Sequence, residues 1–242
     1  MKRKMAVFDI DGTVFRSSLL VEIVEKMIDE GLFPNEARDH YAREYHAWSD
    51  REGTYERYIT AVVESFMTHI KGVHYGDFAD IGERVIEEQQ RRTYRYTRDL
   101  LKELKREGYF LVAISQSPKT VVDKFSKNLG FDKVYGRIYE LGPSDKFTGV
   151  VVEEHLISNK ANIVRRVIEK EGLTFAGSVG VGDTEGDITM LELVEHPICF
   201  NPNKELYQYA KMNEWKVVVE RKDVIYTVLE PTEERVHTAL YH

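Results

Sequence analysis

Near the N-terminus of this chain an apolar run leads directly into two carboxylates, and few folds accommodate such a segment. Residues 6–10 read Ala-Val-Phe-Asp-Ile, and Asp11, Gly12 and Thr13 follow. The β-prone run predicts a buried strand, and Gly12 predicts the turn that ends it. Open α/β sheets bind their ligands outside the carboxyl ends of the strands. The segment therefore predicts such a sheet, with Asp9 and Asp11 at a candidate site.

The two aspartates lie two positions apart, so on a continuing strand their side chains would point the same way. Like charges that share a pocket raise one carboxyl pKa or require a compensating cation. Hard oxygen ligands suit Mg²⁺, which takes one or two carboxylates together with waters and phosphate oxygens. The segment is also compatible with an Asp-Gly turn beside a solvated acid, so the rest of the chain has to discriminate between the two.

The part of the chain that follows these aspartates is helical in pattern to about residue 92. Apolar residues recur at the spacing of one helix face, and no strong strand signal interrupts them. The predicted helices cover residues 18–30, 35–48, 54–70 and 77–96. The pattern predicts an all-helical domain over residues 16–92, inserted into the remaining chain.

From Thr97 onward, predicted helices and strands alternate. The predicted strands cover residues 109–115, 133–141, 148–153, 177–183, 197–200 and 216–220. Apolar strands that alternate with helices imply a parallel sheet covered on both faces. Residues 1–15 and 93–242 are therefore predicted to form a doubly wound, Rossmann-like α/β core. The segment from Arg221 onward fits neither pattern clearly, and Pro231 is expected to break any helix there.

Composition argues against several other kinds of protein. The formal net charge of −7 disfavours a nucleic-acid-binding surface as the main function. The N-terminal segment is too short and too acidic for a signal peptide, and no apolar stretch approaches the ~18 residues of a membrane helix. The single cysteine, Cys199, fits a reducing compartment and is expected to be buried in a strand. We expect a cytoplasmic protein without a nucleic-acid or membrane partner.

Further polar residues fall where the alternation places strand ends. Predicted strands end at Ser115 and Asp183, Asp187 lies shortly after the second of these, and Lys160 begins the helix between them. The carboxyl ends of parallel strands meet at one edge of a sheet, so these groups converge on the edge that carries the first two aspartates. A hydroxyl, a cation and several carboxylates are therefore expected around one site.

In this arrangement the chain resembles the haloacid dehalogenase-like (HAD) superfamily, and specifically its phosphatase branch near the phosphoserine phosphatases, subfamily IB. The resemblance covers roughly residues 5–220 and lies in four motifs in the order and spacing of the family. The motifs are Phe-Asp-Ile-Asp-Gly-Thr at residues 8–13, Ala-Ile-Ser-Gln-Ser-Pro at 113–118, the lysine of Ser-Asn-Lys-Ala-Asn-Ile at 160, and Val-Gly-Val-Gly-Asp-Thr-Glu-Gly-Asp at 179–187. Each motif alone is weakly specific, whereas the ordered set is specific.

The resemblance implies a phosphatase and assigns roles to these residues. Asp9 would be the nucleophile that forms an aspartyl-phosphate, and Asp11 would protonate the leaving alcohol and then activate water. Ser115 would donate a hydrogen bond to a phosphoryl oxygen, and Lys160 would neutralise charge on the same group. These four are the candidate catalytic residues.

The resemblance also implies a Mg²⁺ cofactor. Its ligands would be the Asp9 carboxylate, the Asp11 backbone carbonyl and Asp183, while Asp187 would orient Lys160 or a metal-bound water. These four aspartates are the candidate metal-site residues.

The helical insertion resembles the cap of this branch, which would close over the site and exclude water. Substrate choice is therefore expected within the insertion and at its rim. The candidate substrate-binding residues at the rim are Phe15, Arg16, Ser18 and Gln116. Ser117 either caps the next helix, with Pro118 at the first helical position, or contacts phosphate at the N-terminus of that helix.

The implied substrate is a small phosphomonoester, and the protein is expected to be a monomer or a homodimer. Phosphoserine phosphatases carry glutamate at the position of Ser18 and glycine at that of Gln116, so phosphoserine is in doubt. The aromatic residues between Tyr41 and Tyr58 either pack the helical domain or form a box for a quaternary ammonium group such as that of phosphocholine. Two alternatives stay open: a phosphotransferase that uses the same aspartyl-phosphate, and a catalytically idle binding protein on the same fold.

Overall fold

The computed structural model describes residues 2–152, 157 and 159–231, and an α/β sheet organises them. Within these residues eight strands pair in the order β4-β3-β2-β1-β5-β6-β7-β8. The strands are β1 Lys4–Asp9, β2 Phe110–Pro118, β3 Lys133–Leu141, β4 Phe147–Val152, β5 Thr174–Gly182, β6 His196–Phe200, β7 Lys216–Arg221 and β8 Val224–Leu229. Neighbouring strands from β3 to β7 run parallel, and β4 and β8 join the two edges antiparallel.

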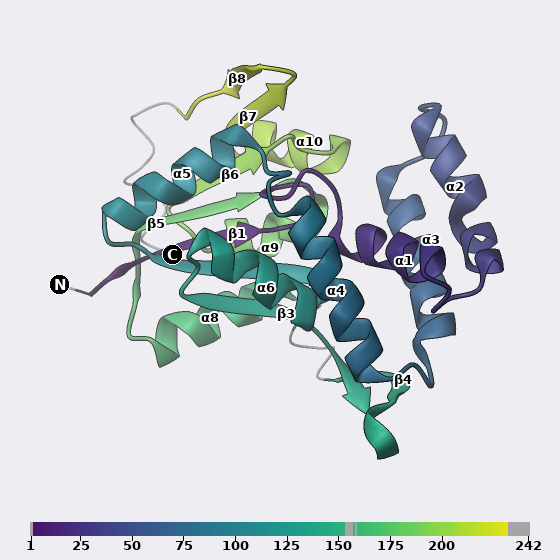
Figure 1. Cartoon of the computed structure of the whole chain (residues 1–242). Coiled ribbons are helices and arrows are strands. Elements are labelled where there is room, and N and C mark those ends of the chain that lie inside the picture. The colour runs from purple at the N-terminus through teal and green to yellow at the C-terminus, as the bar shows by residue number, and fades with distance from the viewer. Residues whose placement is uncertain (1, 153–156, 158, 232–242) are drawn as a thin grey trace.

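The chain winds outward from β1 in both directions, through β2 and β3 on one side and through β5, β6 and β7 on the other. This order confirms the predicted doubly wound, Rossmann-like fold. Sheets of this kind bind ligands where the winding changes direction, outside the carboxyl ends of the strands. β1 lies at this position and ends at Asp9. Figure 1 shows that its carboxyl end points toward the side of the molecule where α1, α2 and α3 gather.

Helices cover both faces of the sheet. Side chains alternate between the two faces along each strand, so each face carries apolar side chains that the helices bury. On β1, Ala6 and Phe8 belong to one apolar cluster, whereas Met5 and Val7 belong to another. The covering helices are α5 Arg95–Arg106, α6 Lys119–Leu129, α8 Lys160–Lys170, α9 Ile188–Leu191 and α10 Lys204–Met212. The first cluster takes residues from α5 and α6, and the second takes residues from α8, α9 and α10.

Residues 16–92, which we call the helical region, contain the next set of helices. They are α1 Leu19–Asp29, a 3-10 turn Asn35–Arg38, α2 Asp39–Ser49, α3 Tyr55–Ile70 and α4 Tyr75–Gln89. The prediction of one helix over residues 77–96 is wrong, because α4 ends at Gln89. The chain there pairs with a distant segment instead: the Arg16 amide donates to the Arg92 carbonyl at 2.9 Å, and the Tyr94 amide donates to the Val14 carbonyl at 3.1 Å. The two connections between the helical region and the sheet therefore lie side by side.

The helical region also contacts the sheet through the β3–β4 hairpin. The Gly72 amide donates to the Phe147 carbonyl at 2.8 Å, and the Phe147 amide donates to the Val73 carbonyl at 3.0 Å. The Phe147 ring packs edge-on against Phe78 of α4, with ring centroids 5.2 Å apart. Apolar side chains of the helical region and of one sheet face form one continuous cluster. The division into a cap domain and a core domain stays a prediction.

The Phe147→Ala substitution is expected to lower the free energy of unfolding by about 3–5 kcal/mol, because it removes a buried ring and leaves a cavity. Phe147 is 5% exposed and lies between the hairpin and α4. Val150→Ala on the same strand is the control, because Val150 is 52% exposed and should cost no more than ~0.5 kcal/mol. Urea denaturation would measure both values, and equal losses would show that the hairpin is not anchored as described.

The C-terminal part of the chain, which the sequence left open, begins with a strand. β8 pairs with β7, and Val218 lies opposite Thr227 in this register. Pro231 follows shortly after the strand, and any helix beyond it lies outside the described residues. The expectation for Cys199 is confirmed, because this residue is buried within β6. Among the described helices none is long and apolar enough to span a membrane.

Candidate active site

The candidate site lies at the carboxyl edge of β1, β2 and β5. Asp9 is the last residue of β1, Ser115 belongs to β2, and Asp183 directly follows β5. Phe8 pairs with Val181, and Asp9 pairs with Ile114, so these strand ends lie level across the sheet. The structure thus brings together the groups that the alternation of helices and strands predicted at one edge.

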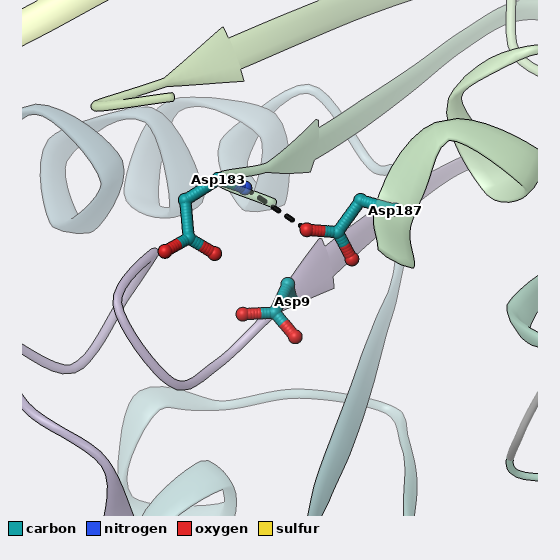
Figure 2. Close-up of side chains that lie close together, drawn as sticks. All are labelled: Asp9, Asp183 and Asp187. Carbon is teal, nitrogen blue, oxygen red and sulfur yellow. Dashed lines mark hydrogen bonds between the residues drawn. The ribbon is translucent and has the colours of Figure 1, made fainter. Parts of the chain in front are cut away.

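Three carboxylates face a common space at this edge (Figure 2). Asp9, Asp183 and Asp187 each offer an oxygen, and these oxygens lie within 4.8 Å of one another. Asp187 is fixed because its Oδ2 accepts hydrogen bonds from the backbone amides of Asp183 at 3.0 Å and Thr184 at 3.1 Å. Asp183 is fixed by Thr13, whose hydroxyl donates to Asp183 Oδ1 at 3.0 Å.

Two glycines leave room for these acids. A Cβ atom at Gly12 would lie 2.2 Å from Asp183 Oδ2, and the φ of +81° at Gly12 is also rarely adopted by other residues. A Cβ atom at Gly182 would lie 2.5 Å from the Asp187 side chain. The glycines of the two acidic motifs are therefore required for the carboxylates to approach each other.

Lys160 is the cation that the acid cluster requires. It begins α8, it is buried, and its Nζ donates to Asp9 Oδ1 and to Asp187 Oδ1, each at 2.5 Å. A lysine is rarely buried unless it is paired, and here it is paired twice. Asn159 stabilises the start of this helix, because its side chain caps the helix by accepting from the Ala161 amide.

The second oxygen of Asp9 is left without a protein partner. Asp9 Oδ2 is buried and accepts no hydrogen bond from any described residue. Buried polar atoms are nearly always satisfied, so an unpaired carboxylate oxygen in a group of acids marks a place for a ligand. The carboxylate oxygens of Asp9 and Asp183 are hard donors of the kind that a divalent cation such as Mg²⁺ requires, and Asp187 adds a third carboxylate to the same group, so the cluster fits such an ion.

Burial and mutual repulsion perturb the ionisation of these acids. Burial raises the pKa of Asp9 to about 8; the charge of Lys160 opposes this rise, and the charges of Asp187 and Asp11 add to it. Burial, together with Asp9 and Asp187, raises the pKa of Asp183. For Lys160, burial lowers the pKa, but Asp187 and Asp9 more than offset this effect, and the net pKa is raised. The lysine therefore stays charged at neutral pH, whereas Asp9 and Asp183 hold protons more readily than exposed carboxyl groups do.

Asp11 lies beside this cluster and faces the second motif. Ser115 Oγ donates to Asp11 Oδ2 at 2.5 Å, and Ser117 Oγ lies 3.0 Å from the same oxygen. The Leu19 amide at the start of α1 donates to Asp11 Oδ1 at 2.5 Å. Burial raises the pKa of Asp11, although these hydrogen bonds oppose the rise. A carboxyl group with a raised pKa is suited to carry and return a proton.

The interpretation of Ser117 as a helix cap is wrong. The helix that follows begins at Lys119 with Pro118 at its N-cap, and no side chain caps it. Ser117 Oγ instead accepts from the Leu20 amide at 3.0 Å and contacts Asp11. The local sequence favours a cap, but a partner from α1, far away in the sequence, takes the hydroxyl.

The other rim residues have different surroundings. Arg16 and Ser18 line a pocket of about 970 Å³ that opens beside the acid cluster. Phe15 is fully buried and packs edge-on against Phe125, with ring centroids 5.3 Å apart, so it lies in the core. The Gln116 side chain donates to the Ile157 carbonyl at 2.6 Å and accepts from Arg137 at 2.7 Å, so its amide is engaged within the protein.

Some residues that build the site carry no clear signal in the sequence. Thr13 positions Asp183, and only its place directly after Gly12 in the first motif marked it. Tyr55 lines the pocket from the start of α3, and no local pattern sets it apart from the neighbouring tyrosines. Glu185 of the fourth motif accepts a hydrogen bond from the Asn203 side chain, so this additional acid has a partner within the protein.

Fold and site together define an α/β protein that concentrates carboxylates and one buried lysine at the carboxyl edge of a doubly wound sheet. Comparison with known families agrees with this description. The model of the haloacid dehalogenase-like hydrolases matches residues 6–192. The chain belongs to this family, and the resemblance seen in the four motifs is confirmed.

Individual relatives are distant. The chain is 25% identical over 225 residues to the "Inhibition of morphological differentiation protein" of Streptomyces azureus, covering 90% of this chain and 79% of that protein. It is 24% identical over 210 residues to a phosphoserine phosphatase of Archaeoglobus fulgidus, covering 86% of this chain but 56% of that protein, so it spans little more than half of this relative. A structure of a phospho-aspartyl intermediate analogue of phosphoserine phosphatase matches with a TM-score of 0.61, 22% identity and coverage of 92% and 96%. At this identity the structural match supports the fold alone.

Proposed function

We propose that this protein is a Mg²⁺-dependent phosphatase that hydrolyses a small phosphomonoester through an aspartyl-phosphate. The observation that carries the proposal is Asp9 Oδ2, a buried carboxylate oxygen without a partner, next to a charged Lys160. Such an oxygen is available to attack phosphorus. Membership of the hydrolase family and the phosphoserine phosphatase among its relatives support the same reaction class.

In the first step Asp9 Oδ2 attacks phosphorus, the bond between phosphorus and the ester oxygen breaks, and Asp11 gives its proton to the departing alkoxide. In the second step water attacks phosphorus, Asp11 takes a proton from that water, and the bond from Asp9 to phosphorus breaks. Lys160 and the hydroxyl of Ser115 offset negative charge on the phosphoryl oxygens. Burial raises the pKa of Asp11 and so favours its protonated form, which suits a group that gives a proton and takes one back.

Mg²⁺ would be held by the carboxylates of Asp9 and Asp183 together with the backbone carbonyl of Asp11. When bound, it supplies positive charge that polarises the phosphoryl group and orients it toward the nucleophile. Asp187 would orient Lys160 instead of binding the ion directly, because its oxygens already accept hydrogen bonds from Lys160 and from backbone amides. The helical region would form the cap over this site, since the pocket is lined by both parts of the chain.

Mg²⁺ is expected to stabilise the protein more at pH 8 than at pH 5. In protein kept metal-free by EDTA the pKa of Asp9 rises from its ordinary value of 3.8 to about 8 on folding. The folded state therefore keeps a proton that the unfolded chain has lost, and stability falls as pH rises between these values. Mg²⁺ binds the ionised carboxylate, so its effect grows over the same range. The difference in melting temperature with and without millimolar Mg²⁺ would measure this, and a larger shift at pH 5 would contradict it.

The Asp11→Asn variant is expected to hydrolyse an alkyl phosphate about 10²–10⁴-fold more slowly, because the leaving alkoxide then lacks its proton donor. The leaving group of p-nitrophenyl phosphate needs no proton, so the rate of the first step should fall less for this ester. The variant should then show a burst of nitrophenol. Burst kinetics and mass spectrometry of trapped phosphoprotein would check this. Equal losses in the rate of the first step for both esters would remove Asp11 from the role of acid.

The proposal as a whole is tested by phosphate release from a panel of phosphomonoesters with Mg²⁺ and with EDTA. Parallel measurement of the released alcohol distinguishes hydrolysis from transfer, because a phosphotransferase releases alcohol without an equal amount of phosphate when an acceptor is present. Mg²⁺-dependent release of both products in equal amounts is the expected result. A folded protein that turns over no member of the panel would be a binding protein on this fold.

A further inference from the structure

We propose that the pocket beside the acid cluster is shaped for a planar aromatic ring, so that the substrate is a phosphomonoester whose alcohol carries such a ring. This inference rests on the proposed phosphatase function and specifies its substrate class. Three features support it: aromatic rings line the pocket, arginine side chains lie among them, and the same pocket reaches the acid cluster.

Aromatic side chains of α2 and α3 form one connected group in the pocket wall. We call this group the aromatic wall; its members are Tyr41, Tyr45, Trp48, Tyr55 and Tyr58. Trp48 and Tyr58 are stacked with centroids 5.4 Å apart and planes at 10°. Tyr41 and Tyr58 are buried and serve packing, whereas Tyr45 is 43% exposed and Trp48 and Tyr55 are partly exposed. The wall is therefore both a small core and a surface that offers rings to a ligand.

The charged groups of the pocket disfavour a cationic ligand. The two glutamates in its lining are already neutralised: Glu22 pairs with Arg92 at 2.8 Å, and Glu25 pairs with Arg38 at 2.9 Å. Arg16 and Arg51 line the same pocket and form no ion pair with any described residue. A quaternary ammonium group on these rings would therefore meet the guanidinium groups of Arg51 and of Arg16, which lies over the Tyr94 ring at 5.6 Å. The remaining carboxylate of the lining, Asp183, belongs to the acid cluster to which we assign Mg²⁺. A neutral or anionic ring meets no such repulsion.

The aromatic wall reaches the reacting groups. The pocket that it lines also contains Gly12 and Asp183, so one cavity joins the aromatic wall to the acid cluster. Burial, with a smaller contribution from the negative charges of Asp11 and Asp183, raises the pKa of the Tyr55 phenol. A ring joined to the phosphate by a few bonds would thus contact the wall while phosphorus lies at Asp9.

The size of the pocket is consistent with such a group. Its volume of about 970 Å³ is at the upper end of ordinary ligand pockets, which span roughly 300–1,000 Å³. A leaving group of only a few atoms would touch little of the wall. Offset or edge-on contact between rings gains energy beyond that of apolar burial, so a planar ring is distinguished from a saturated ring of similar size.

The test compares esters matched in leaving group and size. 2-Phenylethyl phosphate and 2-cyclohexylethyl phosphate differ in the planarity of the ring, and phosphocholine and 3,3-dimethylbutyl phosphate differ in charge alone. We expect kcat/KM for the phenyl ester to exceed that for the cyclohexyl ester roughly 10-fold, and the choline ester to gain nothing over its neutral isostere. Equal values for the two ring esters, or a preference for the choline ester, would overturn the inference.

Variants link the preference to the wall. Trp48→Leu and Tyr45→Leu are expected to bring the phenyl-to-cyclohexyl ratio of kcat/KM toward one, and the exposed position of Tyr45 makes the second variant safe for folding. Tyr226→Leu makes the same change on β8, where Tyr226 is 52% exposed and outside the pocket lining, and should leave the ratio unchanged. An unchanged ratio in both wall variants would count against the inference.

Binding of 2-phenylethylphosphonate and 2-cyclohexylethylphosphonate, which cannot be hydrolysed, separates the inference from the proposed function. Calorimetry in the presence of Mg²⁺ would measure both affinities. A preference for the phenyl compound without turnover of any ester would overturn the phosphatase and support the ring site. Turnover without any preference between the rings, in kinetics and in binding, would overturn the ring site alone.

Discussion

The Asp9→Asn variant is expected to release phosphate at least about 10⁴-fold more slowly than the unchanged protein, because asparagine cannot supply the attacking oxygen. The fold should persist, since asparagine has nearly the same size and removes one negative charge from a crowded group of acids. The free energy of unfolding is expected to change by no more than about 1 kcal/mol. Single-turnover kinetics with Mg²⁺ and urea denaturation would provide the two values.

A matched control is Asp80→Asn, which makes the same change on the exposed surface of α4 and should leave turnover unaffected. Mass spectrometry should accompany the assay, because deamidation of the new asparagine would regenerate aspartate and imitate residual activity. Full activity in a variant shown to retain asparagine would remove Asp9 from the role of nucleophile. Lost activity together with lost folding would instead assign Asp9 a structural role.

Lys160→Met is expected to lose turnover and about 3–5 kcal/mol of stability at neutral pH, because it leaves buried acids without their cation. Lys160 Nζ lies 2.5 Å from both Asp9 and Asp187, and the three side chains are buried. The large expected effect therefore reflects the uncompensated charge that remains more than the value of the pair itself. Thermal and urea denaturation in EDTA would measure it, and Mg²⁺ should restore part of the loss.

The double variant Lys160→Met/Asp187→Asn tests this explanation. It removes one cation and one anion, so it should regain stability relative to Lys160→Met while turnover stays low. Lys170→Met, at the exposed end of the same helix, is the control and should be close to neutral. If the double variant were less stable than the single one, the loss would come from packing and not from charge.

The sequence was sufficient to predict the edge of the sheet at which the polar groups meet. Asp9, Ser115 and Asp183 each stand at the end of an apolar run, and the doubly wound order of the strands brings such ends together. The alternation of strands and helices implied a parallel sheet covered on both faces, in which such ends meet at one edge. The assignment of Lys160 also followed from its position at the start of a helix in the same set.

The errors have a common physical cause, which is competition from distant partners. Ser117 has the local context of a helix cap, but the Leu20 amide and Asp11 occupy its hydroxyl. The helix predicted over residues 77–96 ends early, because residues near 92–94 pair with residues 14–16. The placement of Phe15 in the core and of Tyr55 at the pocket likewise depends on how helices pack, which no local pattern encodes.

The side-by-side pairing of the two connections to the helical region has an evolutionary consequence. Because residues 14–16 and 92–94 are hydrogen-bonded neighbours, the chain departs from the sheet and returns to it at one place. A segment with adjoining ends can be lengthened, shortened or exchanged without altering the order of the strands. The sheet edge that carries the acids and the wall that contacts the leaving group can therefore diverge independently, so the reaction can be inherited while its substrate is replaced.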